Sequence, residues 1–296
     1  MTPTVSTQAR TLAELAGVPE FANPRPLRAR APIVAVTGGK GGVGKSTIAS
    51  NLAIAIANAV GRRLAPKVLL VDLDLGLASL DAILGLPRGR HLGDALEQRA
   101  DFDSTIVRGP GGIEVLPAPR GFAQFAALEP AQRDHLLHHL RRLCRARDAA
   151  ILDLPAGIHP DGLAFTQAAD FTLVVATPEP ASLADAYAVV KLALERSPLA
   201  RIGFVVNGPA GPVEARQLAE RFAAVVQRFL GRPVESLGWI PRDPAIGRAI
   251  AARRPVFLSE TTSASAAAFR LLAARVDAVL ADLRSQWEGE ASSLGA

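Results

Sequence analysis

The sequence predicts an α/β fold, in which a mainly parallel central sheet carries helices on both faces. Two observations lead to this prediction. Short runs rich in Val, Ile and Leu alternate along the chain with longer segments of helical periodicity, and aromatic residues make up only 5% of the 296 residues. A core with few aromatic residues must be built from aliphatic side chains, which is typical of parallel strands covered by helices on both faces.

The strands and helices follow one another in a regular order. Helical periodicity is clearest in 46–60, 131–145, 182–196 and 212–230, and again near the end of the chain. The apolar, β-branched runs that we expect to form strands are 33–36, 67–73, 112–118, 149–155, 171–177, 201–207 and 235–241. Each long helical segment follows a strand candidate, so the sequence predicts a parallel sheet in three layers.

We expect four parts along the chain. Residues 1–31 form an N-terminal arm, in which a short amphipathic segment precedes a linker rich in proline and arginine. Residues 32–262 form the main domain. Residues 263–287 form a C-terminal amphipathic helix, and residues 288–296 form a tail that we expect to be disordered.

Composition narrows the classes of function. The net charge of +5 is small and spread along the chain, so no specific nucleic acid is expected as a partner. The single cysteine, Cys144, excludes a disulfide within the chain and a zinc or iron–sulfur site made of this chain's thiolates alone. We find no secretory signal and no apolar run near the ~20 residues of a membrane span, and therefore expect a cytoplasmic protein.

The segment GGKGGVGKST (38–47) lies between the first expected strand and the first expected helix. Its residues 39–46 match G-x-x-x-x-G-K-[ST], the pattern of a loop that surrounds phosphates. Glycines let backbone N–H groups approach the phosphates, and the following helix presents the positive end of its dipole. We expect Lys45 to reach the β- and γ-phosphates and the Ser46 hydroxyl to bind Mg²⁺. The expected nucleotide-binding residues of the loop are Gly39, Gly41, Gly42, Val43, Gly44, Lys45, Ser46 and Thr47.

Three aspartates follow two of the expected strands. VDLDLG (71–76) places Asp72 and Asp74 at the carboxyl end of one strand, and DLPAG (153–157) places Asp153 at the end of another. Ligands bind at this edge of open α/β sheets, and alternate residues of a strand point the same way. Asp72 and Asp153 are therefore candidates, with Ser46, for the Mg²⁺ site.

The loop GKGGVGKST resembles the signature loop of the MinD/ParA ATPases, whose additional early lysine corresponds to Lys40. The resemblance implies a P-loop NTPase fold and Mg²⁺-dependent hydrolysis of ATP by a homodimer that forms on ATP binding. In such a dimer Lys40 reaches the partner's ATP. The resemblance also implies that Asp74 orients the attacking water, that Asp72 belongs to the same switch, and that Asp153 serves the second switch and the metal. Lys40, Lys45 and Asp74 are the catalytic candidates.

Four later stretches, 75–86, 177–192, 204–208 and 237–250, together resemble the flagellar number regulators of the FlhG/FleN group, over about residues 32–280. The resemblance implies control of flagellar number or placement, with an FlhF-type GTPase and flagellar regulatory or switch proteins as partners. It also implies that Asn207 and the segment Pro241, Arg242 and Asp243 border the adenine. A division-site MinD, favoured by Pro155, and a ParA-type DNA-partitioning ATPase remain alternatives.

The two ends of the chain carry further expectations. TQARTLAEL (7–15) is similar to a short helix with which flagellar regulators stimulate FlhF, and Gln8 is the candidate activator because a glutamine can orient a water for GTP hydrolysis. An amphipathic capping helix and a fragment of a helix-turn-helix-like pattern are the alternatives. Residues 266–287 carry one apolar stripe, which either docks on the sheet or makes reversible contact with the inner membrane, at the cell pole. Balanced flanking charges are unlike the basic face typical of membrane-surface helices.

Overall fold

The computed structural model describes residues 31–59, 66–75, 79–119 and 128–293. The expected activator segment with Gln8 and nearly all of the expected N-terminal arm lie outside the described residues.

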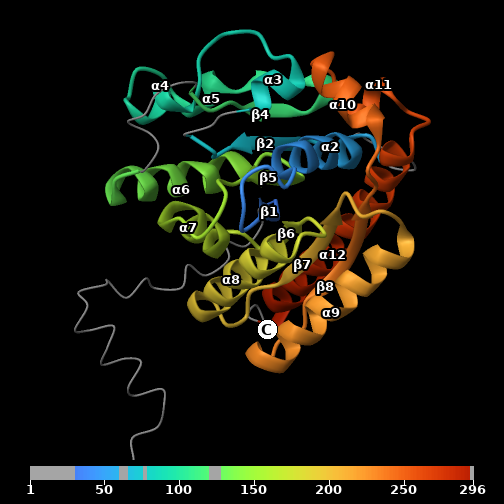
Figure 1. Ribbon diagram of the computed structural model, residues 1–296. Helices are drawn as coiled ribbons and strands as arrows, with labels where there is room; N and C mark the ends of the chain where they lie inside the picture. Colours follow the sequence, from blue (N-terminus) through green and yellow to red (C-terminus); the bar gives the residue numbers. More distant parts are fainter. Residues whose placement is uncertain (1–30, 60–65, 76–78, 120–127, 294–296) are drawn as a thin grey trace, which may run out of the picture.

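An eight-stranded sheet forms the centre of the described structure (Figure 1). Its strand order is β3-β4-β2-β5-β1-β6-β7-β8, and all neighbours are parallel except β3 and β4. The predicted fold class is confirmed. The strands are β1 (Ile33–Thr37), β2 (Val68–Asp72), β3 (Val107–Arg108), β4 (Glu114–Leu116), β5 (Ala149–Asp153), β6 (Phe171–Ala176), β7 (Ile202–Asn207) and β8 (Glu235–Ile240).

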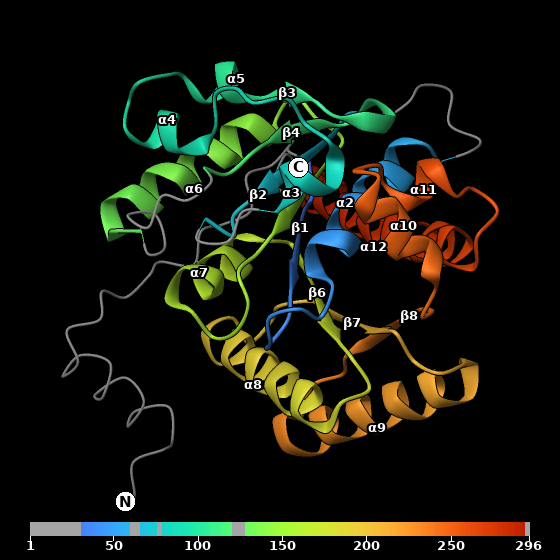
Figure 2. The same ribbon diagram turned by 45° about the horizontal axis from the view of Figure 1, so that its top comes forward.

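Helices cover both faces of the sheet (Figures 1 and 2). One face packs on α2 (Lys45–Ala57) and α12 (Ala264–Ser293), with α3 (Leu80–Leu84), α10 (Pro244–Ala251) and α11 (Val256–Ser259) beside them. The other face has two halves. One packs on α4 (Leu92–Leu96), α5 (Phe102–Thr105), α6 (Pro130–Cys144) and α7 (Pro160–Ala168), and the other on α8 (Pro180–Arg196) and α9 (Pro212–Leu230).

The two sides of each strand enter different cores because successive side chains alternate in direction. In β1, Val34 and Val36 join the core with α2 and α12, whereas Ile33 and Ala35 join the core with α6. Side chains of β1 are therefore buried on both faces, and this accounts for the continuous apolar runs in the sequence.

The long C-terminal helix α12 lies beside α2 and against β8 (Figures 1 and 2). Its apolar stripe is buried in the core shared with α2 and the sheet; the buried side chains include Phe269, Leu272, Val276, Leu280 and Leu283. Asp282 accepts a hydrogen bond from Arg201 at 2.5 Å, and Arg284 donates to the Asp148 carbonyl at 2.6 Å. The stripe that was expected to dock or to meet lipid is docked in this structure. Among the described helices, none combines the length and the apolar character needed to cross a membrane.

Candidate nucleotide-binding site

The glycine-rich loop connects β1 to α2 at the carboxyl edge of the sheet. Gly44, the N-cap of α2, has φ 91°, a left-handed backbone conformation that residues with a side chain rarely adopt. A Cβ on Gly44 would also lie 2.3 Å from Nδ2 of Asn207, and a Cβ on Gly39 would lie 2.2 Å from the backbone of Asp185. The loop therefore passes between two neighbouring segments at distances that only glycine permits.

A cavity of about 550 Å³ opens over this loop. Its walls include most of the expected phosphate-binding residues and the catalytic candidate Asp74, but Gly39, Lys40 and Val43 do not line it. The expected residues that line it are Gly41, Gly42, Gly44, Lys45, Ser46, Thr47 and Asp74. Lys45 is only 6% exposed. The cavity therefore brings together the residues expected at the phosphates.

Asp72 and Asp153 lie side by side, because they are register partners on the adjacent parallel strands β2 and β5. Both are buried, with 1% and 0% of their surface exposed. Asp72 accepts hydrogen bonds from the backbone N–H groups of Asp74 (3.1 Å) and Leu80 (3.4 Å). Neither carboxyl oxygen of Asp153 has a hydrogen-bond partner among the described residues. The oxygens of Asp72 are therefore already engaged by backbone N–H groups, whereas those of Asp153 remain available to a ligand.

Burial also changes the acidity of this pair. It raises the pKa of Asp153 to about 7, although the nearby Ser46 hydroxyl and Lys45 ammonium group oppose the rise. Burial, and next the charge of Asp153, raise the pKa of Asp72 well above its usual range. Two neighbouring buried carboxyls without a strong cation favour protonation.

These properties fit a hard divalent cation. Mg²⁺ prefers carboxylate and hydroxyl oxygens, and the buried oxygens of Asp153, which have no partner at hydrogen-bond geometry among the described residues, lie near the Ser46 hydroxyl. Asp153 and Ser46 could therefore hold Mg²⁺ directly or through water. Asp72, whose oxygens already accept two backbone hydrogen bonds, is better suited to orient the segment that carries Asp74.

Lys40 lies on the same loop as Lys45 but in different surroundings. Its side chain is 46% exposed, and its Nζ lies 2.7 Å from Oε2 of Glu179, the N-cap residue of α8. This hydrogen bond, and next the charge of Glu179, raise the pKa of Lys40. The same bond, and next the charge of Lys40, lower the pKa of Glu179. Solvent screens an exposed pair of this kind, so Lys40 can exchange Glu179 for another partner at little cost.

The residues expected at the adenine divide into two groups. Pro241 and Arg242 line a second cavity, of about 590 Å³, together with Pro178, Gly208 and Trp239. Asn207 and Asp243 do not line it. Asn207 donates from Nδ2 to the Val43 carbonyl of the phosphate loop at 2.8 Å, so its Oδ1 is the amide atom left to accept a hydrogen bond.

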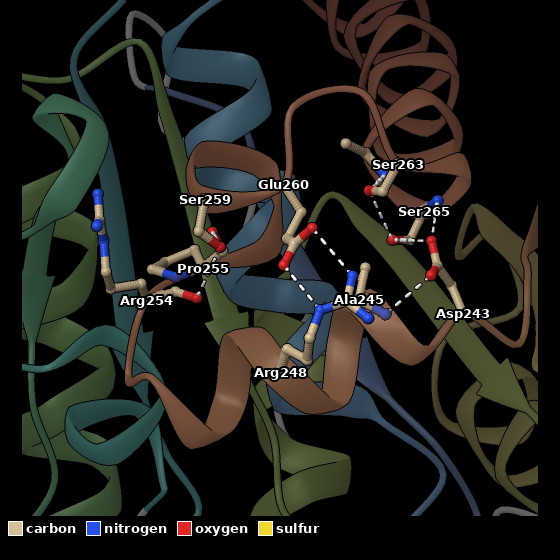
Figure 3. Close-up of polar contacts among 10 residues, drawn as sticks. Asp243, Ala245, Arg248, Arg254, Pro255, Ser259, Glu260, Ser263 and Ser265 are labelled. Atoms are coloured by element: carbon tan, nitrogen blue, oxygen red, sulfur yellow. Dashed lines mark hydrogen bonds and ion pairs between the residues drawn. The ribbon is translucent and has the colours of Figure 1, made fainter.

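Asp243 has its carboxylate turned towards helix ends (Figure 3). Its Oδ1 accepts from the Ala245 N–H at 2.9 Å, and its Oδ2 accepts from the N–H and the hydroxyl of Ser265 at 3.0 and 2.8 Å. In this structure the Asp243 side chain acts as a helix cap.

Several residues of the site were not expected from the sequence. His159 and Asp161 line the phosphate cavity from the start of α7, as do Ser79 and Ile83 from the α3 segment. The His159 Nδ1 lies 3.8 Å from Oδ2 of Asp161. His159 follows Asp153 by six residues, so the rule that ligands bind beyond the carboxyl ends of strands could have included the whole loop.

Comparison with known proteins agrees with this geometry. Residues 34–256 match the family described as the CobQ/CobB/MinD/ParA nucleotide binding domain. The chain is 36% identical to the antiactivator FleN of Pseudomonas aeruginosa, covering 83% of this chain and 86% of FleN. It is 29% identical to the flagellum site-determining protein YlxH of Helicobacter pylori, covering 75% of this chain and 73% of YlxH.

A solved structure shares the fold. The septum site-determining protein MinD of Pyrococcus horikoshii OT3, complexed with Mg-ADP, superposes with a TM-score of 0.70 at 26% identity, covering 86% of this chain and 98% of that one. Cavity, loop, carboxylates and relatives lead to the same conclusion. The chain belongs to the CobQ/CobB/MinD/ParA nucleotide-binding family and is an ATPase of the MinD/ParA type that uses ATP and Mg²⁺.

Proposed function

We propose that this chain is a switch that dimerises on ATP binding and regulates flagellar number or placement through protein partners. The observation that carries the dimer is the position of Lys40, which is half-exposed, absent from the phosphate cavity wall and bonded to the surface carboxylate of Glu179. Lys45 already lines the cavity as its buried cation. Lys40 is therefore free to serve a nucleotide held by a second copy of the chain.

Exchange of partners by Lys40 is energetically reasonable. Its bond to Glu179 is exposed and weak, whereas a bond to a phosphate oxygen in a closed interface is charge-assisted and shielded from water. Dimerisation would thus replace a surface pair within one chain by a stronger contact between chains. This step would couple ATP binding to a change in the exposed surface, which partner proteins could recognise.

The proposed roles of the other residues follow from their positions. Lys45 binds the β- and γ-phosphates, and Ser46 and Asp153 hold Mg²⁺, which supplies charge neutralisation at the phosphates when bound. Asp74, half-buried in the cavity wall, orients the attacking water. Asp72 fixes the Asp74 segment by accepting its N–H.

The flagellar role is supported by the relatives FleN and YlxH, whose names describe an antiactivator and a flagellum site-determining protein. We further propose an FlhF-type GTPase as a partner, stimulated through Gln8, together with flagellar regulatory or switch proteins. In the cytoplasm the protein would act near the cell pole.

Membrane contact through residues 266–287 would require α12 to leave the sheet. Each large apolar side chain of the stripe gains about 1.5–3 kcal/mol from burial, so undocking five of them costs on the order of 10 kcal/mol. Lipid would have to bury the same stripe in return. Sedimentation with anionic liposomes, with and without ATP, tests this part of the proposal.

Light scattering after size exclusion tests the dimer. Asp74→Ala with ATP should elute as a dimer, because ATP binds but is not hydrolysed, and Lys40→Ala should hydrolyse no ATP. An Asp74→Ala protein that stays monomeric with saturating ATP would refute the switch. Pull-downs with FlhF and with MinC separate the flagellar from the division role, and ATP-dependent, salt-sensitive DNA binding would instead favour a ParA-type partitioning protein.

A further inference from the structure

One carboxylate joins two helices at the edge of the second cavity. Asp243 is the N-cap of α10 and, through Ser265, also binds the first turn of α12 (Figure 3). Ser265 is fully buried. Ser263 completes the junction, because its hydroxyl accepts from the Ala266 N–H at 3.1 Å and lies 3.1 Å from the Ser265 hydroxyl.

The charge of Asp243 suits this position. Hydrogen bonds from Ser265 and Ala245 lower the pKa of Asp243, so the carboxylate is ionised at neutral pH. The first turns of helices carry unpaired N–H groups and the positive end of the helix dipole, which a carboxylate stabilises. Here one anion serves the ends of both α10 and α12, and its loss would loosen both.

The junction is continuous with the cavity wall. Asp243 directly follows Pro241 and Arg242, which line the second cavity. On the opposite side of the segment, the Gly208 N–H donates to the Ile240 carbonyl at 2.8 Å and ties the loop after β7 to the end of β8. The segment 241–242 is therefore held between two fixed points, one on β7 and one on α12.

We propose that Asp243 is a positioning residue that couples the base-binding wall at Pro241 and Arg242 to the first turn of α12. The inference rests on the proposed function, since it takes the second cavity as the place of the nucleotide's base. Coupling is reciprocal. A looser first turn of α12 lowers nucleotide affinity, and bound nucleotide protects that turn from opening.

The proposal predicts a different kinetic effect for changes at Asp243 than for changes at the residues that bind the phosphates. Because the base is common to ADP and ATP, weakening its wall should reduce the affinity for both nucleotides by the same factor. In the proposed function the chemical step depends on Lys40, Lys45, Asp74 and the metal, so kcat should not change while KM rises.

Ser265→Ala gives the sharpest test, because the residue lies on α12 and outside both cavities. The change removes the hydroxyl bond to Asp243 at 2.8 Å but keeps the backbone N–H. We expect the dissociation constants of ADP and ATP to rise about tenfold, equal to about 1.4 kcal/mol, with kcat unchanged. In hydrogen exchange, ADP should protect the amides of residues 265–268 in the wild type and much less in the variant.

Glu260→Gln is the matched control. It breaks the nearby pair with Arg248, whose nitrogens lie 3.1 Å from the Glu260 oxygens, but it leaves the contacts of Asp243 intact (Figure 3). Asp243→Asn, which keeps an acceptor but loses the charge, should weaken both nucleotides at least as much as Ser265→Ala. Thermal denaturation and circular dichroism establish that each variant is folded.

Two results would overturn the proposal in different ways. If the wild type binds ADP and folded Ser265→Ala binds it with the same affinity as Glu260→Gln, the coupling is wrong while the proposed function stands. If the wild type binds no adenine nucleotide, the proposed function fails and the coupling fails with it.

Discussion

Replacing Asp153 by asparagine should change how stability depends on pH, because the fold buries this carboxyl and the part of the chain that the structure describes gives its oxygens no hydrogen-bond partner. An unfolded aspartate titrates near its ordinary pKa of 3.8, whereas burial raises the pKa of Asp153 to about 7. Between these values the folded state holds a proton that the unfolded state has lost. The free energy of unfolding therefore falls as pH rises through this window.

The size of the effect follows from the shift. A difference of about 3 pKa units (7 minus 3.8), at about 1.36 kcal/mol per unit, gives a loss of about 4 kcal/mol in the metal-free wild type by neutral pH. Below pH 3.8 both states are protonated and the penalty is absent. Asparagine carries no charge, so Asp153→Asn should lose this slope and be the more stable protein at neutral pH without metal. Asp72, whose pKa burial raises well above its usual range, contributes a slope of its own in both proteins, so the prediction concerns the difference between them.

Urea unfolding in chelator, between about pH 5 and about pH 8, measures the prediction. Asp134→Asn, an exposed change on α6, is the control and should keep the wild-type slope. Adding Mg²⁺ with ADP should restore stability to the wild type at neutral pH but not to Asp153→Asn, because a ligand stabilises only the state that binds it. Parallel pH curves for Asp153→Asn and the wild type would refute the reasoning.

Three further changes test other parts of the site. Glu179→Gln should strengthen ATP-dependent dimerisation, because it releases Lys40; light scattering that shows weaker association would contradict this. Asn207→Ala should weaken ADP binding about tenfold in calorimetry, since the phosphate loop loses its contact with β7; unchanged affinity would exclude that support. Phe269→Ala should lower the free energy of unfolding by about 3–5 kcal/mol in urea, as expected for a fully buried aromatic side chain; a loss below about 1 kcal/mol would mean that α12 is not docked in solution.

The sequence was a good guide to the long elements and a poor one to the short ones. The seven strands of the parallel part were predicted, most of them because burial on both faces leaves continuous aliphatic runs; β8, which is partly exposed, is the exception. Strand β3 has two residues, and helices α3, α4, α5 and α11 have four or five each. Such elements are too short for a periodic pattern, so their conformation depends on packing against the rest of the fold.

The residues of the site also divide into those that could be predicted from the sequence and those that could not. The phosphate loop and the aspartates were found because each is local in sequence and lies at a strand end. Glu179 was missed as a partner of Lys40 because 139 residues separate the two, and Ser265 was missed because it meets Asp243 only when α12 docks. Asp243 itself was expected at the adenine, whereas its carboxylate caps two helices.

The two lysines of the phosphate loop show why burial decides the role of a charge in this site. Lys45 is 6% exposed, and its charge acts on the buried carboxyl of Asp153, whose oxygens have no hydrogen-bond partner within the described ranges. The position of Lys45 is therefore fixed by the fold and by a carboxyl that needs compensation. Lys40 is 46% exposed and its pair with Glu179 is screened by solvent, so its position can change when it meets a more strongly binding anion. A buried cation suits nucleotide binding, which must be constant. An exposed cation suits the proposed dimerisation, which must be reversible.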